Sequence, residues 1–151
     1  MGEPVRAAVL AACALLLTGC SSAIAGSAGP ITVTDADRQL VTGYFSALNT
    51  AGAEGAAKQH ALLEDTQHPD FPQTDCKLPE GTIKVQPTLS TLRLDPDWTP
   101  PKGDEHPRGV VLVVAVTLTV VQDGVEIGSQ IGSQHVVLLN DKAYGFAPCA
   151  K

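Results

Sequence analysis

Residues 110–125 read Val-Val-Leu-Val-Val-Ala-Val-Thr-Leu-Thr-Val-Val-Gln-Asp-Gly-Val, and this stretch decides the fold. Its first half is apolar at every position, which indicates a strand covered on both faces, and its second half alternates valine and leucine with threonine. Asp123-Gly124 is typical of a tight type I′ hairpin turn. We therefore predict a central strand over residues 109–122 and an antiparallel return strand over residues 125–139.

The return strand contains the tetrad Ile-Gly-Ser-Gln twice, at residues 127–130 and 131–134. This repeat is too short to be that of a solenoid. Glycine inside a strand usually marks a bend, a bulge or a close approach of another backbone. We expect Gly128 and Gly132 to let this long strand curl.

Two further strands complete the predicted sheet. Residues 82–94 alternate apolar and polar side chains, but the phase changes after Leu89, which implies a β-bulge. Pro87 favours an edge position because it cannot donate a backbone hydrogen bond. Beyond the return strand, residues 140–142 predict a turn and residues 143–147 a last strand.

A long helix precedes the sheet in the sequence. Thr34 is a typical N-cap, and Asp35 and Asp37 lie in the first turn, where the helix dipole favours negative charge. Asn49 and Gly52 predict the end of this helix. Its apolar stripe has helical spacing and consists of Leu40, Val41, Tyr44, Phe45 and Leu48.

A second, shorter helix is predicted over residues 54–64. Its weaker apolar stripe consists of Ala57, Ala61 and Leu62. Residues 65–76 contain two prolines and predict a loop. The candidate metal ligands of this loop are Asp65, His68, Asp70 and Asp75. Their spacing fits no recognised ligand pattern, so we expect solvated side chains and no metal site.

A long connection over residues 95–108 holds four prolines and the only tryptophan, Trp98. Connections longer than about 12 residues without structure of their own are often functional. Trp98 would equally well cap the core, so both interpretations stay open. Trp98 is therefore a candidate pocket or surface residue, and His106 in the same connection is expected to be solvated.

The start of the chain predicts export. Arg6 is followed by twelve uncharged residues, 7–18, the length of a signal-peptide core and too short to cross a bilayer core of about 30 Å. Leu17-Thr18-Gly19-Cys20 then resembles the lipobox of bacterial lipoproteins at all four positions. The resemblance implies a diacylglyceryl thioether on Cys20 and cleavage before it. The alternatives are a soluble secreted protein or a buried N-terminal helix.

Three segments follow from this interpretation: a signal peptide over residues 1–19, a flexible tether over 20–33 and one domain over 34–151. Two of the four cysteines, Cys76 and Cys149, lie in that domain. Export places them in an oxidising compartment, so we expect a disulfide, for which loop closure contributes on the order of 4 kcal/mol. A catalytic thiol or a metal pair is the alternative, but the CxxC spacing is lacking.

The predicted element order, two helices and then about four strands, indicates an α+β fold with the helices on a curved antiparallel sheet. A small β-sandwich with an N-terminal helix is the alternative. Tyr-Phe-Ser-Ala-Leu-Asn at residues 44–49, the Asp123-Gly124 hairpin and Ala-Tyr-Gly-Phe at 143–146 resemble the nuclear-transport-factor-2-like, or cystatin-like cone, superfamily. The resemblance covers roughly residues 35–149. It implies a sheet wrapped around the long helix.

Some members of that superfamily are isomerases that use a helix-one tyrosine as oxyanion donor and an aspartate as base. Tyr44 stands where such a tyrosine would, but Ile-Lys-Val at residues 83–85 replaces the expected acidic base. The sequence also has no Gly-x-Ser-x-Gly elbow and no P-loop. We therefore predict no catalytic, cofactor-binding or metal-ligating residues. A core aromatic is the favoured interpretation of Tyr44, which stays a candidate pocket or surface residue.

The functional prediction is a non-enzymatic domain that is lipid-anchored to the cell membrane and faces the extracytoplasmic side. It resembles uncharacterised envelope lipoproteins of actinobacteria, which are high-GC Gram-positive bacteria. We expect it to bind an envelope protein or a small apolar ligand. A net charge of −6 without a basic cluster argues against nucleic acid. The alternatives are an isomerase or dehydratase that uses Tyr44, or a lipid carrier.

Overall fold

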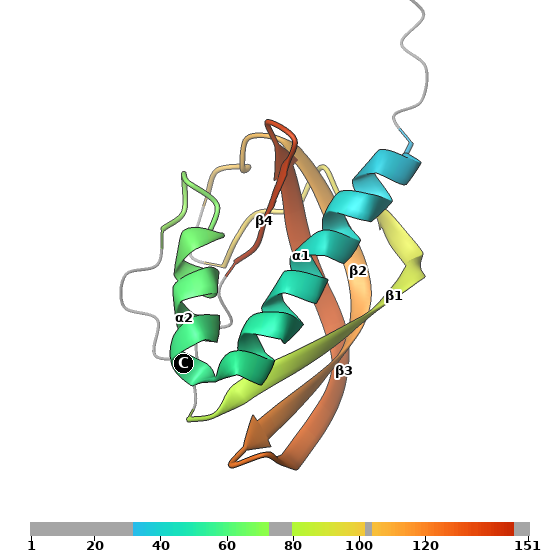
Figure 1. The fold of residues 1–151 in the computed structure, drawn as a ribbon. Coiled ribbons are helices and arrows are strands. Elements are labelled where there is room, and N and C mark those ends of the chain that lie inside the picture. Colours follow the sequence, from blue (N-terminus) through green and yellow to red (C-terminus); the bar gives the residue numbers. More distant parts are fainter. Residues whose placement is uncertain (1–31, 73–79, 102–103, 147–151) are drawn as a thin grey trace, which may run out of the picture. The chain divides into compact units, whose positions relative to one another are not determined.

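The computed structural model describes residues 32–72, 80–101 and 104–146. Two helices lie on one face of an antiparallel sheet whose four strands follow the order of the chain, β1-β2-β3-β4 (Figure 1). The predicted α+β fold is confirmed. The described strands all belong to one sheet, so the alternative of a small β-sandwich is wrong. No helix in the described segments has both the length and the apolar character of a membrane span.

Helix α1, Asp35–Glu54, begins as predicted. The Thr34 hydroxyl accepts from the Asp37 backbone N–H, and the Asp37 carboxylate accepts from the Thr34 N–H, which forms a capping box. The predicted end at Asn49 and Gly52 is wrong, because the helix continues to Glu54. Gly55 ends it instead, with a φ of 122° that other residues rarely adopt.

Helix α2, Ala56–Asp65, follows directly. The expected stripe is wrong in part, because Ala57 and Ala61 are exposed, whereas Gln59 and Leu63 are the buried residues. Hydrogen bonding rather than hydropathy decides which side of α2 is buried. The Gln59 amide is buried because it pairs with backbone groups of β1 and of α1.

Strands β1, Thr82–Leu94, and β2, Val110–Gln122, pair with a register shift after Thr88, which confirms the predicted bulge and the edge position of β1. Strand β3, Val125–Leu139, curves along β2 with a second shift beside Gly128 (Figure 1). Strand β4 is shorter than predicted and comprises only Lys142–Tyr144. After it, Gly145 leaves the β3 edge to bridge Gln67.

The core lies between α1 and the sheet. Phe45 and Leu48 of α1 pack against Leu112, Val114 and Val136. The opposite face of the sheet is also covered at this end. The buried valines of that second face are Val111, Val113 and Val137. Strand β2 is therefore buried on both sides over its first half, as the continuous apolar run predicts.

The outer edge of β1 is covered by side chains of the helices. The Asn49 amide donates to the Val85 carbonyl and accepts from the Val85 N–H, at 2.8 and 2.7 Å. The Gln59 amide makes the same pair of bonds with Ile83, at 2.6 and 2.8 Å. Two helix amides thus occupy the positions that a neighbouring strand would fill.

Candidate functional site

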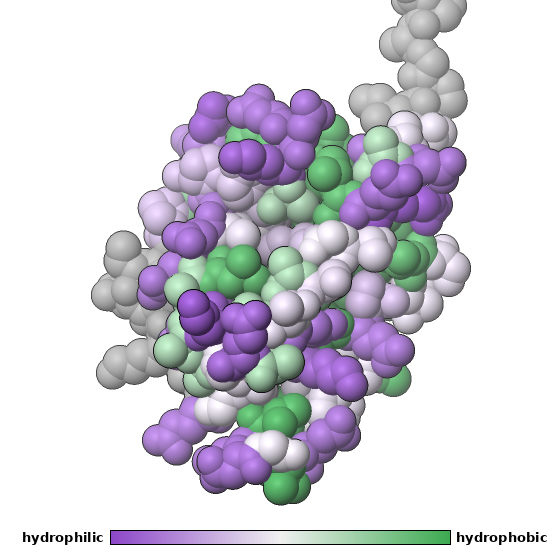
Figure 2. Space-filling model, in the orientation of Figure 1, coloured by the Kyte–Doolittle hydropathy of each residue, from purple (hydrophilic) through white to green (hydrophobic). Residues whose placement is uncertain are grey.

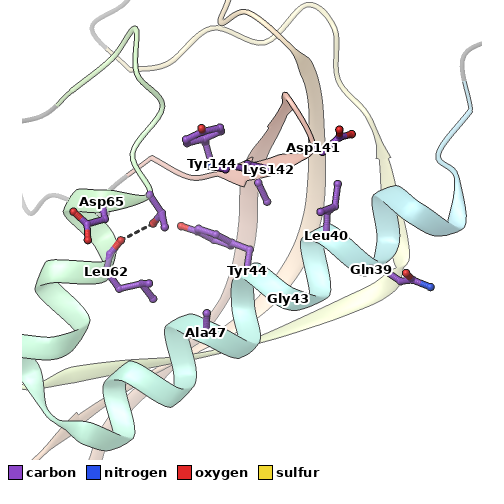
Figure 3. A pocket seen from close by; sticks show the side chains of 12 residues that line it. Gln39, Leu40, Gly43, Tyr44, Ala47, Leu62, Asp65, Asp141, Lys142 and Tyr144 are labelled. Carbon is purple, nitrogen blue, oxygen red and sulfur yellow. Dashed lines mark hydrogen bonds between the residues drawn. The ribbon is translucent and has the colours of Figure 1, made fainter.

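A groove of about 500 Å³ opens where α1, α2 and the β3–β4 turn meet, and we call it the α1–α2–β4 groove (Figure 3). Its volume lies within the range of small-molecule sites. The residues that line it are Gln39, Leu40, Gly43, Tyr44, Ala47, Leu62, Asp65, Thr66, Asp141, Lys142, Ala143 and Tyr144. The lining is mostly apolar in area, and the charged groups are one basic and two acidic side chains.

Tyr44 crosses this groove. Figure 3 shows its ring extending from α1 toward the end of α2, with Leu62 on one side and Lys142 and Tyr144 on the other. The ring meets Phe45 edge-to-face at a centroid distance of 5.2 Å. The sequence predicted the position of Tyr44 on the stripe of α1. In the structure its half-buried ring packs against the core and also lines the groove.

The Tyr44 hydroxyl is held by protein groups rather than directed to the open groove. It bonds the Thr66 side chain and lies so close to Gly145 that a methyl group there would collide with it. Burial raises the pKa of Tyr44, and the Thr66 hydrogen bond offsets part of that rise. A neutral phenol fixed in this way orients the ring but is a weak proton donor.

Trp98 lies on the other side of the sheet from Tyr44. Its ring stacks on His135 at 4.0 Å with an interplanar angle of 13°, and it meets Phe146 edge-to-face at 4.7 Å. His135 Nε2 is 2.8 Å from Asp95 Oδ2. The two candidate residues therefore do not form one site. Sequence reasoning overlooked His135, although its place in the apolar C-terminal half of β3 was a signal.

The expected solvated loop after α2 is wrong at His68, which is fully buried. The Asp70 N–H donates to His68 Nδ1 at 3.2 Å, so the proton lies on Nε2, which donates to the Arg108 carbonyl at 2.8 Å. The ring also stacks on Phe146 at 6.0 Å. A buried histidine with both nitrogens satisfied is a structural residue, which hydropathy alone does not reveal.

Asp70 is exposed and forms two hydrogen bonds with the Arg108 guanidinium, at 2.8 and 2.6 Å. These bonds are the main reason that the pKa of Asp70 lies below its usual value. His106 is exposed, as expected, and its Nδ1 lies 3.1 Å from the Trp98 carbonyl. Within the described residues, no cluster of three or more His, Cys, Asp or Glu could hold a metal ion.

The predicted lipidation site Cys20 and the predicted disulfide partners Cys76 and Cys149 lie outside the described residues. The chain segments that lead to the two partners do meet. The Gly145 N–H donates to the Thr66 carbonyl at 2.9 Å. The rings of Phe71 and Phe146, which precede the two cysteines by a few residues, are 6.2 Å apart.

The geometry of the α1–α2–β4 groove offers an apolar site with a fixed tyrosine and a few charged groups at its margin, and no nucleophile paired with a base. Comparison of the chain with protein-family models, with curated proteins and with solved structures finds no match.

Proposed function

We propose that this chain is an exported, lipid-anchored and non-enzymatic domain that binds a small apolar ligand in the α1–α2–β4 groove. The observation that carries the proposal is the groove itself, about 500 Å³ with a mostly apolar lining. Pockets of this size and character bind small molecules through apolar contact and a few polar groups. Asp65, Asp141 and Lys142 would contact the polar end of such a ligand.

A small ligand suits this face better than a large protein surface does. Figure 2 shows charged and polar side chains between small apolar areas over the face that carries the helices. Protein partners usually dock on a continuous apolar patch of several hundred Å². A protein partner therefore stays the second candidate for the groove, through a single inserted apolar side chain.

Two arguments favour binding over the isomerase or lipid-carrier alternatives. An oxyanion donor must point at the reacting oxygen, but the Tyr44 hydroxyl points at Thr66 and Gly145. A carrier needs an interior large enough for acyl chains, yet Phe45 and Leu48 pack directly onto the sheet. The groove is accordingly proposed as a site at the protein surface.

The anchor and the disulfide are parts of the same proposal. The lipobox at residues 17–20 supports lipidation of Cys20, and a Cys20→Ala variant should leave the membrane fraction and lose radiolabelled palmitate. The contact between Phe71 and Phe146 supports the Cys76–Cys149 bond, because it brings the approaching chain segments together. That bond predicts an intact mass two hydrogens below the reduced mass.

Ligand binding can be tested with a variant whose larger side chain fills the groove. Ala47 is an exposed residue of α1 that lines the groove, so Ala47→Trp would occupy the space without disturbing the core. Ala57→Trp makes the same change on an exposed position of α2 outside the groove lining. Both variants of residues 21–151 should be exported into an oxidising compartment and purified beside the parent chain.

Native mass spectrometry, with a denatured control, then reports any retained molecule. We expect the parent and Ala57→Trp to carry an extra mass that disappears on denaturation, and Ala47→Trp to carry none. The apolar dye anilinonaphthalene sulfonate provides a second readout, since only Ala47→Trp should displace it. If all three chains have a bare mass and bind the dye equally, the groove is not a ligand site.

A further inference from the structure

The two edges of the sheet differ in how far their backbone N–H and C=O groups are paired. On the β1 edge, Ile83 and Val85 are paired with the amides of Gln59 and Asn49. Further along the same edge, Pro87 has no N–H to expose, and the Leu89 carbonyl accepts from Arg38 at 2.8 Å. This edge is closed to another strand, in the way that soluble proteins protect their edges.

Among the residues that the structure describes, nothing pairs with the β3 edge over most of its length. Strand β4 pairs only with Val137, Leu138 and Leu139, and no other described strand covers residues 125–136 on that side. Neither lysine nor proline protects this stretch, and its one acidic residue is Glu126. The side chain of Ile131 is 85% exposed. In Figure 1 the end of β3 at the β2–β3 hairpin extends beyond both helices.

The alternation of an antiparallel ladder shows which backbone groups face outward. Leu139 and Lys142 flank the two-residue Asn140-Asp141 turn, so they form a hydrogen-bonded pair. Counting back by two from Leu139, the residues whose N–H and C=O point to the β4 side are Val137, His135, Ser133, Ile131 and Ser129. The last three of these have no strand beside them in the described structure.

We propose that two copies of this chain pair through this edge, with the β3 strands antiparallel and Ile131 opposite Ile131 of the second copy. Ser129 of each copy would then stand opposite Ser133 of the other, and these residues would exchange backbone hydrogen bonds. The two sheets would join into one continuous sheet across a two-fold axis.

The repeated Ile-Gly-Ser-Gln tetrad makes the edge complementary to itself. Around Ile131, the repeat places a glutamine opposite each glycine, with Gln130 facing Gly132 and Gln134 facing Gly128. A side chain built at either glycine would meet nothing within 4 Å, so the partner's glutamine has room. The pairing also brings two exposed isoleucines together on the outer face of the sheet.

Charge and size define how strong this contact is. The chain has a net charge of −6, but residues 127–134 carry no charged side chain, so two copies meet at a neutral strip. A contact limited to one strand edge would bury less than about 1,200 Å² in total, the small end of specific interfaces. We therefore expect a dissociation constant in the range of about 1 to 100 μM, and anchoring to one membrane would raise the effective concentration.

The first experiment is sedimentation velocity on residues 21–151, which include all described residues, at concentrations up to about 1 mM. Ile131→Lys should weaken dimerisation by about tenfold or more, because two ammonium groups would face each other. Ala57→Lys adds the same charge at an exposed position of α2 that is not part of the paired β3 edge, and should dimerise like the parent. Circular dichroism checks that both variants fold.

The second experiment tests the register in which the two β3 strands pair. The two Ile131 positions would be about 5.5 Å apart between Cα atoms, which suits a disulfide. Ile131→Cys should therefore form an intermolecular disulfide under mild oxidation, whereas Ser129→Cys should not exceed the parent. Crosslinking through Ser129→Cys instead would overturn the proposed register and with it the proposal.

Three further results would refute the proposal that a second copy of the chain pairs with the β3 edge. The chain could stay monomeric at every concentration, or Ile131→Lys could dimerise like the parent. Alternatively, hydrogen exchange at the backbone amides of Ser129 and Ile131 could slow only when an envelope protein is added. The edge would then pair with a strand of that protein.

Discussion

Replacing Gln59 by methionine tests whether the helix amides close the β1 edge. The Gln59 side chain is 2% exposed, and its amide nitrogen donates to the Ile83 carbonyl at 2.6 Å and to the Leu48 carbonyl at 3.0 Å. Its amide oxygen accepts from the Ile83 N–H at 2.8 Å. Methionine keeps the length and the apolar stem but removes all three hydrogen bonds.

The expected loss follows from these contacts. A typical hydrogen bond contributes about 1 kcal/mol net, so three bonds give about 3 kcal/mol. The Ile83 N–H and the carbonyls of Ile83 and Leu48 would lose their Gln59 partner, and water reaches them only in part because Ile83 is buried. Gln59→Met should therefore lower the folding equilibrium constant by about a hundredfold.

Urea unfolding of residues 21–151, followed by circular dichroism, measures this loss. Lys58→Met is the matched control, because Lys58 is an exposed neighbour on α2 and should change the free energy of unfolding by less than about 0.5 kcal/mol. A loss below about 1 kcal/mol for Gln59→Met, with an unchanged urea slope, would show that these bonds do not hold β1.

Two other predictions follow from the site. Gly145→Ala should cost about 1 to 3 kcal/mol because its methyl group collides with the Tyr44 hydroxyl and with the ring carbon Cζ that carries it. Adding Tyr44→Phe removes the hydroxyl but leaves that ring carbon, so it should restore only part of the loss in a urea-unfolding cycle, and additive effects would contradict the collision. Arg108 lowers the pKa of Asp70 in the folded state, so the carboxylate stabilises the fold above its unfolded pKa of about 3.9. The stability advantage of the parent over Arg108→Gln should be complete at neutral pH and disappear as the pH falls below about 4; an advantage that persists at pH 2 would contradict it.

The sequence predicted those parts of the fold that depend on local patterns. The continuous apolar run in β2, the Asp123-Gly124 turn and the phase change in β1 each produced the expected element. The Thr34 cap also formed as predicted. The residues of each signal lie within a few positions of each other, so a single sequence is enough to predict these elements.

The errors come from interactions between distant residues. Gly52 predicts a helix end, yet α1 continues to Glu54. In the structure Gly52 packs against Gln59 and Ile83 instead, where a side chain would not fit. The local sequence predicts a solvated His68, because the partners that bury it, the Arg108 carbonyl and Phe146, are far away in the sequence. The groove was missed as a unit because three separate elements build it.

The long connection after β1 now has a structural explanation. Strand β2 is apolar on both faces, so Val111 and Val113 need a cover on the face that the helices do not reach. Trp98 supplies part of it by stacking on His135, which Asp95 holds by a hydrogen bond. The connection must be long because it crosses that face. Its length is therefore no evidence of function, and the search for function moves to the α1–α2–β4 groove and the open edge of β3.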